Sequence, residues 1–125
     1  MGRDALKLSN YGCVNIHPSM LPDAKGVDPV FQSLLRGTPV LGVTVHFMTL
    51  DLDAGRILAQ RSLETCAESS AFATTALLFR EGAELLVASI DSIVGGGAGV
   101  PQAGAGNYQS WLARNATADK GINIR

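Results

Sequence analysis

An amide and an imidazole stand two residues apart at the end of a short apolar run, Cys-Val-Asn-Ile-His-Pro at residues 13–18. Side chains two apart on an extended chain share a face, so Asn15 and His17 project together while Val14 and Ile16 turn towards a core. The proline after His17 ends the strand. A hydrogen-bond donor beside a group that titrates near neutrality suits acyl chemistry. The alternative is a polar strand end whose side chains bond only to local backbone groups.

A predicted hairpin supplies further polar side chains. Alternating residues indicate a strand over Val40–Met48, with Thr44 and His46 on one face and valines on the other. A second strand follows from Arg56 to about Leu63. The intervening loop is longer than a tight turn needs and carries two carboxylates, which indicates a shaped, functional loop between antiparallel strands.

Two helices are predicted around these strands. Asp28 and Pro29 form a typical helix start, in which the aspartate accepts hydrogen bonds from first-turn amides, and Gly37 ends the helix. The longest helix is predicted over Ser69–Ile93, with Ser69 or Ser70 as its cap. Apolar residues recur along it at steps of four and three, which predicts a core-facing stripe. The stripe consists of Phe72, Ala76, Phe79, Ala83, Leu86, Ile90 and Ile93.

The chain has three predicted parts. Residues 1–94 hold every predicted strand and helix and form the folded domain. Residues 95–107 are rich in glycine and are expected to be a flexible connector. Residues 108–125 form a tail in which Tyr108 and Trp111 anchor the last ordered piece, followed by a polar, mobile end.

Composition excludes several classes of protein. With 46% hydrophobic and 17% charged residues, the 125-residue chain is globular. Its net charge of −1 gives no basic excess for gripping phosphates, so this chain alone is not expected to bind nucleic acid. No apolar run has the length of a membrane span, and Cys13 and Cys66 form no disulfide framework. We therefore expect a soluble, cytoplasmic chain with no membrane partner.

Three motifs in order resemble the family of 10-formyltetrahydrofolate-dependent formyltransferases. They are Asn15-Ile16-His17-Pro18-Ser19-Met20-Leu21-Pro22, then Gly42-Val43-Thr44-Val45-His46, then Leu52-Asp53-Ala54-Gly55 leading into Ile57-Leu58-Ala59-Gln60. The Tyr11-Gly12-Cys13 lead-in and Pro101-Gln102 are most similar to the methionyl-tRNA branch. The conjunction of motifs in this order is more specific than any one of them.

The resemblance implies a site and a reaction. Asn15, His17 and Asp53 would be catalytic, with transfer of a formyl group from 10-formyltetrahydrofolate to an amine acceptor, either a small molecule or borne on tRNA. Residues expected to bind the folate are Leu21, Pro22, Thr44, His46, Asp51, Leu52 and Gly55. No metal is implied.

The resemblance also implies a three-layer α/β, Rossmann-like formyltransferase fold that is incomplete here. Family members carry a parallel βα half before the first motif, whereas only 14 residues precede Asn15. The strand before His17 would then have a bare edge, which invites pairing with another chain. We expect a homo-oligomer, or an amino-terminal half that is missing from this chain.

Other interpretations of the same residues remain. His17, His46 and Asp53 form a two-histidine, one-carboxylate set that some metal sites use, although their spacing fits no compact metal motif. His46 is also readily explained as a satisfied strand histidine, and Asp51 as a solvated loop carboxylate. At the level of function, the alternatives are a formyltetrahydrofolate hydrolase and a non-catalytic truncated homologue that acts as an assembly module.

Overall fold

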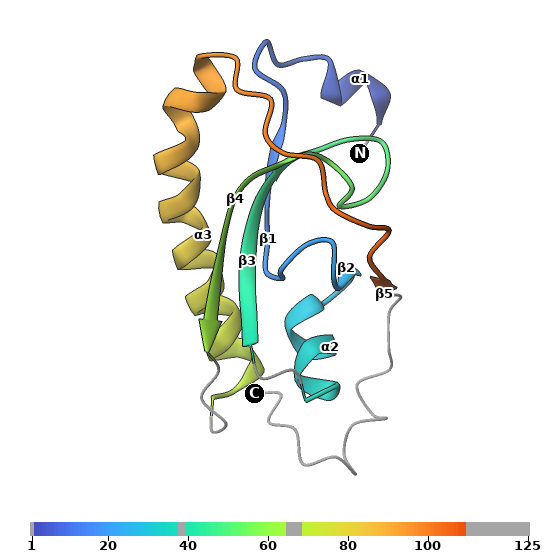
Figure 1. The fold of residues 1–125 in the computed structure, drawn as a ribbon, viewed down its shortest axis with the longest axis vertical. Coiled ribbons are helices and arrows are strands. Elements are labelled where there is room, and N and C mark those ends of the chain that lie inside the picture. The colour runs from blue at the N-terminus through green and yellow to red at the C-terminus, as the bar shows by residue number, and fades with distance from the viewer. Residues whose placement is uncertain (1, 38–39, 65–68, 110–125) are drawn as a thin grey trace.

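The computed structural model describes residues 2–37, 40–64 and 69–109 (Figure 1). In chain order its elements are α1 (Arg3–Leu6), β1 (Val14–His17), β2 (Lys25–Gly26), α2 (Pro29–Leu35), β3 (Val40–Phe47), β4 (Ile57–Glu64), α3 (Ala71–Val94) and β5 (Tyr108–Gln109). The predicted strands and long helix lie within two residues of the observed ones, whereas the two-residue strands β2 and β5 were not predicted. Cys66, Trp111 and most of the predicted tail lie outside the described residues.

One antiparallel sheet positions the polar side chains. Its strand order is β1-β3-β4, with β3 in the centre, which confirms the predicted hairpin. Along β3 the side chains alternate: Val43 and Val45 are fully buried, and Thr44 and His46 between and after them turn to the other face. The sequence period of two therefore sends the valines to the core and the polar residues to the opposite side.

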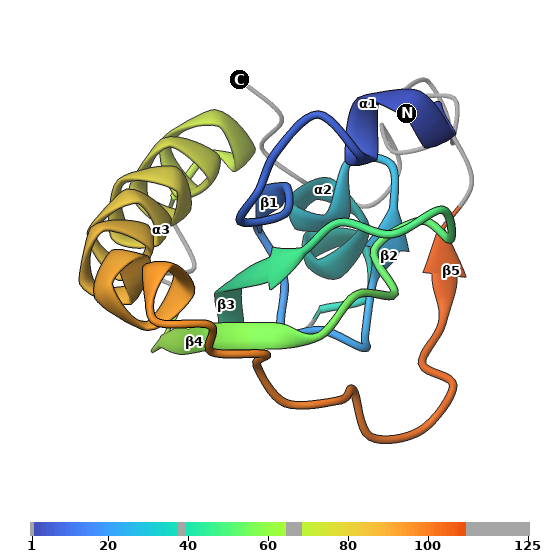
Figure 2. The ribbon, with the colours of Figure 1, turned by 90° about the horizontal axis from the view of Figure 1, so that it is seen from above.

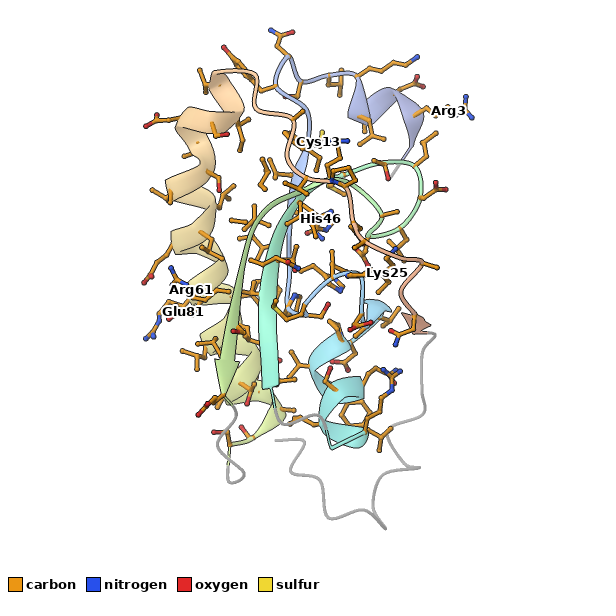
Figure 3. All side chains as sticks on the ribbon, viewed as in Figure 1. Arg3, Cys13, Lys25, His46, Arg61 and Glu81 are labelled. Carbon is orange, nitrogen blue, oxygen red and sulfur yellow. The ribbon has the colours of Figure 1, made fainter. Side chains whose placement is uncertain are left out.

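The long helix α3 covers the valine face of the sheet, and β2 and β5 lie on the other side (Figure 2). The short helix α2 contacts α3. The core cluster that joins these parts consists of Val30, Leu41, Val43 and Leu78. The helix approaches β1 closely at Gly82, where a Cβ atom would overlap the side chains of Ile16 and Val43. Arg61 of β4 adds an ion pair to Glu81 of α3 (Figure 3), although such partly exposed pairs contribute little to stability.

The predicted core stripe of α3 is wrong. Phe72, Phe79 and Ile90 are 75%, 44% and 46% exposed, whereas the helix residues that are buried against the sheet are Thr74, Leu78, Gly82 and Ser89. Both faces have helical spacing, but the buried face is built mainly from small and hydroxylated residues, which a hydropathy pattern does not mark. Although α3 has an apolar exposed face, neither it nor any other helix in the described ranges is long and apolar enough to cross a membrane.

The helix starts were predicted at the right places, but only one cap has the expected bond. The Ser70 side chain accepts a hydrogen bond from the Ala73 amide, as predicted for α3. Asp28 precedes α2, but its side chain makes no capping bond, and that part of the prediction is wrong. Asp28 has a left-handed backbone with φ of 52°, which differs from the extended conformation of a typical capping residue.

Glycine-rich residues 95–107 are hydrogen-bonded to β4 and to β2. Val100 exchanges two backbone bonds with Ile57, at 2.7 and 2.8 Å. Further along, the Lys25 amide donates to the Asn107 carbonyl, and β5 then pairs in parallel with β2. These contacts were not anticipated when composition indicated a flexible connector, because backbone hydrogen bonding leaves no mark in composition.

We expect Leu78→Ala to lower the free energy of unfolding by about 2–5 kcal/mol, because Leu78 is 1% exposed in the core cluster. The matched control is the adjacent Phe79→Ala, which removes a larger but 44% exposed side chain and should cost less than half as much. Chemical denaturation of both variants measures the difference. An equal or larger loss for Phe79→Ala would mean that the exposed stripe is covered in solution.

Candidate active site

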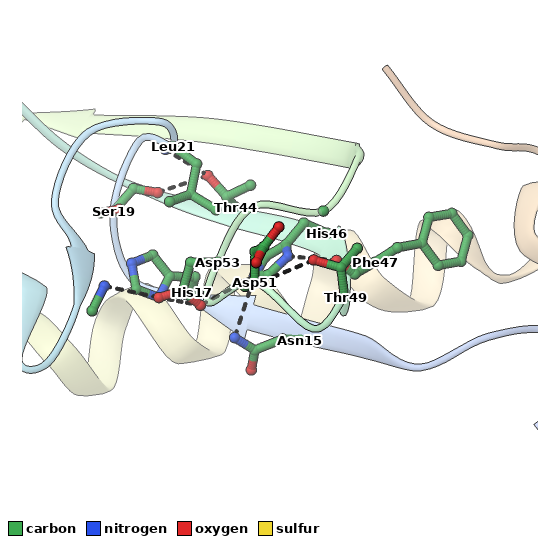
Figure 4. A network of polar contacts seen from close by, with 12 residues as sticks. Asn15, His17, Ser19, Leu21, Thr44, His46, Phe47, Thr49, Asp51 and Asp53 are labelled. Atoms are coloured by element: carbon green, nitrogen blue, oxygen red, sulfur yellow. Dashed lines mark hydrogen bonds and ion pairs between the residues drawn. The ribbon is translucent and has the colours of Figure 1, made fainter. Parts of the chain in front are cut away.

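The polar residues of β1 and β3 meet on one face because the two strands pair in a fixed register. Asn15 lies opposite His46, and His17 lies opposite Thr44 (Figure 4). The prediction that Asn15 and His17 share a face is therefore confirmed. The loop between β3 and β4 then brings Asp53 over the same face (Figure 4).

Asp53 is the charged centre of this group and is 8% exposed. Its Oδ1 atom lies 3.6 Å from His17 Nδ1 and 3.7 Å from His46 Nε2. These separations are too long for hydrogen bonds but short enough for strong attraction to a protonated imidazole. Its Oδ2 atom accepts a hydrogen bond of 2.8 Å from the Gly26 amide. A buried carboxylate needs such partners to remain ionised.

The hydrogen-bond partner of His17 identifies the nitrogen that can exchange a proton. His17 Nε2 lies 2.9 Å from the carbonyl oxygen of Ala24. A carbonyl only accepts, so Nε2 carries a proton and donates it there. The remaining nitrogen, Nδ1, faces Asp53. A proton taken up by His17 therefore sits on Nδ1, beside the carboxylate that stabilises it.

His46 has the opposite tautomer. Its Nδ1 atom donates to the Phe47 carbonyl at 2.8 Å, so Nε2 is the free nitrogen of the neutral ring. The Asn15 amide nitrogen lies 3.3 Å from Nε2 and donates to it. Burial lowers the pKa of His46 below its ordinary value, which favours the neutral ring that Asn15 requires as an acceptor.

Thr44 and Gln60 hold the loop that follows His17. The Thr44 hydroxyl donates to the Ser19 carbonyl at 2.7 Å and accepts from the Leu21 amide at 3.1 Å. Gln60 on β4 donates to the Leu21 carbonyl at 2.8 Å and to the Thr44 hydroxyl at 2.9 Å. Gln60 was not identified as a site residue from the sequence. Its place in the third motif, on the same side of the sheet as Thr44, could have indicated this role.

The other predicted folate-binding residues fall into two groups. Asp51 and Leu52 line a cavity of about 60 Å³ together with His46 and Asp53. Leu21, Pro22 and Gly55 do not line it. Gly55 instead packs so closely on the Phe47 carbonyl that any side chain would overlap it, and Leu21 is buried.

A larger cavity of about 250 Å³ lies elsewhere, beside Met20, Ser33 and Arg36, and it contains none of Asn15, His17 and Asp53. We place the candidate site by its chemistry and not by cavity size. Within the described part of the chain, no three His, Cys, Asp or Glu side chains are arranged to hold a metal ion. The alternative of a metal centre at the two histidines therefore has no support in this geometry.

Comparison with known proteins identifies the class. The Formyl transferase family model matches residues 1–90, and the chain belongs to this family. The formyltransferase PseJ from Anoxybacillus kamchatkensis, solved with tetrahydrofolate and a formamido sugar nucleotide, is similar at TM-score 0.75 and 30% identity, over 87% of this chain and 58% of that one. The fold is therefore the formyltransferase fold, as the motifs predicted.

Methionyl-tRNA formyltransferases are among the chain's curated relatives. The enzyme of Borrelia garinii subsp. bavariensis is 31% identical over 80% of this chain and 32% of its own length. That of Halorhodospira halophila is 38% identical over 75% of this chain and 30% of its own length. The chain thus spans about a third of the length of the curated relatives it matches.

The lowered pKa of His46 predicts a pH-dependent stability. The unfolded chain takes up a proton near pH 6.5, whereas the folded chain does so only at lower pH. The contribution of the neutral His46 ring to the free energy of unfolding is therefore present in full above about pH 6.5. It is lost as the pH falls through the folded-state pKa. We expect the unfolding free energy to fall on acidification more steeply than in His46→Gln. Parallel curves for the two proteins from pH 7.5 to 5 would contradict this.

Proposed function

We propose that this chain builds the catalytic site of a formyltransferase that moves a formyl group from 10-formyltetrahydrofolate to an amine. Family membership supports the reaction class, and the folate in the PseJ structure supports the donor. Residues 1–94 are assigned to the catalytic domain, residues 95–107 to a connecting segment and residues 108–125 to a tail. Because the chain spans a third of its relatives, the proposal concerns the part of the enzyme that these residues form.

The observation that carries the proposal is the convergence of Asn15, His17 and Asp53 around His46. Hydrogen bonds to Ala24 and Phe47 fix each imidazole, so each presents one nitrogen to the carboxylate. A purely structural strand end does not require a buried charge between two titratable rings, because burying a charge is costly.

Each residue has a distinct role in the proposed reaction. The acceptor nitrogen attacks the formyl carbon, and the carbonyl oxygen becomes an oxyanion. The Asn15 amide donates to that oxygen, a contact that contributes on the order of 3 kcal/mol in comparable sites. The proton shed by the attacking nitrogen passes to Nδ1 of His17, whose positive charge Asp53 stabilises. Collapse breaks the bond to folate N10, and that nitrogen leaves with the proton.

The acceptor is a small-molecule or tRNA-borne amine. Curated relatives are named for methionyl-tRNA, and similar structures are named for sugar substrates. A net charge of −1 gives this chain no basic surface excess, so contacts to a tRNA acceptor would come from other parts of the enzyme. With water as the acceptor, the same residues would instead release formate.

A second candidate function rests on surfaces outside the site. β1 is an edge strand within the described sheet, and the apolar stripe of α3 is exposed. Unpaired edges and exposed apolar faces favour association, so a non-catalytic assembly module would use both.

The purified chain should bind a tetrahydrofolate analogue, as measured by calorimetric titration. We expect Thr44→Val to weaken binding by about tenfold or more, because the hydroxyl holds the loop at Ser19 and Leu21. Thr75→Val is the matched control, since its hydroxyl bonds only within α3. Absence of folate binding, together with stable self-association, would favour the assembly module.

Asn15→Ala and Asp53→Ala should each reduce formyl transfer at least ~100-fold while the chain stays folded. The reason is that Asn15 supplies the oxyanion donor and Asp53 stabilises the protonated His17. Asp91→Asn, which removes an exposed carboxylate on α3, is the control and should leave the rate unchanged. Formate and formylated amine are measured separately. Equal losses of thermal stability in Asn15→Ala and Asp53→Ala would indicate that both residues are structural.

A further inference from the structure

The amide of Gln102 holds the backbone of the loop that carries Asp53. Its Nε2 atom donates to the carbonyl oxygens of Asp53 and Gly55, at 2.7 and 2.9 Å. Asp53 has a left-handed backbone with φ of 51°, which a residue other than glycine keeps only when its surroundings support it. Because both hydrogens of one nitrogen are used, the two bonds fix the turn around the intervening Ala54.

The segment before Gln102 is itself attached to β4. Val100 exchanges backbone hydrogen bonds with Ile57, and the Arg56 guanidinium donates to the carbonyls of Ala98 and Gly99. The attachment to β4 therefore places Gln102 beside the loop that carries Asp53. It contacts the Asp53 backbone, and the Gly26 amide contacts the carboxylate.

The two ends of the Gln102 amide differ in their hydrogen bonding. Its Oε1 atom is buried and has no hydrogen-bond partner among the described residues. An unpaired buried acceptor is unfavourable, so the stabilising contacts of this side chain are those of its donor end. Among the described residues, only the Nε2 end of the side chain has hydrogen-bond partners, and these partners are carbonyls of the loop that carries Asp53.

We infer that Gln102 is a positioning residue, which holds the Asp53 carboxylate at the two imidazoles by bonding the backbone on either side of Ala54. Gln102 lies outside residues 1–90, which the family model matches, so the match itself assigns it no role. The inference concerns the placement of Asp53, and its consequence for transfer rests on the proposed function.

The placement is testable without catalysis because the chain has only two histidines. Burial is the main cause that lowers the pKa of His46, and His17 and Lys25 lower it further, whereas the Phe47 carbonyl and then the Asp53 carboxylate raise it. Gln102→Met keeps the side chain's size and removes both donors. We expect the His46 imidazole signal in an NMR titration to move to lower pH in Gln102→Met, in the same direction as in Asp53→Asn.

Two further variants separate this role from general loosening. Arg56→Met removes the bonds to Ala98 and Gly99 but leaves the Gln102 amide in place, so the His46 titration should not move. Gln102→Asn keeps the amide, but its side chain is one methylene shorter and does not reach both carbonyls. It should therefore shift the titration as Gln102→Met does, and it replaces Gln102→Met if that variant does not fold. An unchanged titration in the folded Gln102 variant, or an equal shift in Arg56→Met, would overturn the inference.

In the transfer assay, Gln102→Met should lower kcat by up to about 100-fold with little change in the KM for folate, as expected for a misplaced catalytic group. A fall in kcat with the titration shift supports the inference fully. If the unmodified chain neither binds folate nor transfers a formyl group and the titration still shifts, the proposed function is wrong and the positioning role stands. If kcat is unchanged although the titration shifts, Asp53 has no role in transfer and the consequence drawn for catalysis is wrong.

Discussion

The buried carboxylate of Asp53 is the constraint on which the rest of the site depends. A charge that is 8% exposed must be compensated by its neighbours. Here one oxygen accepts from the Gly26 amide, and the other faces His17 Nδ1 and His46 Nε2, which attract it only when a ring is protonated. The loop between β3 and β4, the loop after β1 and both strands must therefore meet at one point. Displacement of any of them would remove one of the groups that face the carboxylate.

The antiparallel sheet meets this requirement through its period of two. Valines on one face of β3 pack on α3, and this packing fixes the strand so that Thr44 and His46 face the other way. Pairing with β1 then places Asn15 beside His46. Apolar burial and site geometry are thus set by the same alternation, so a slip of one residue would turn every polar side chain away from the site.

The sequence predicts these short-range relationships well. Alternation along the strands was enough to place Asn15 with His17 and Thr44 with His46, and the motif order pointed to Asp53. The prediction failed for α3, because helical spacing reveals an apolar face but not which of two faces packs on a sheet. Gln60 and Gln102 were missed as contacts for a related reason. Each bonds to a backbone carbonyl far along the chain, and such partners leave no pattern in the sequence.

Several side chains of the site bond to main-chain carbonyls of its loops and not to loop side chains. His17 bonds to the carbonyl of Ala24, Gln60 to that of Leu21 and Gln102 to that of Asp53. Carbonyl groups in a loop lack the hydrogen-bond donors that a neighbouring strand provides, and these three side chains supply donors to them. The same hydrogen bonds fix the orientation of the three side chains. Because the acceptor is the main chain, the identity of the loop side chain is not specified by the bond. The donors are therefore the constrained positions, and the residues that accept from them can vary as long as the backbone path is kept.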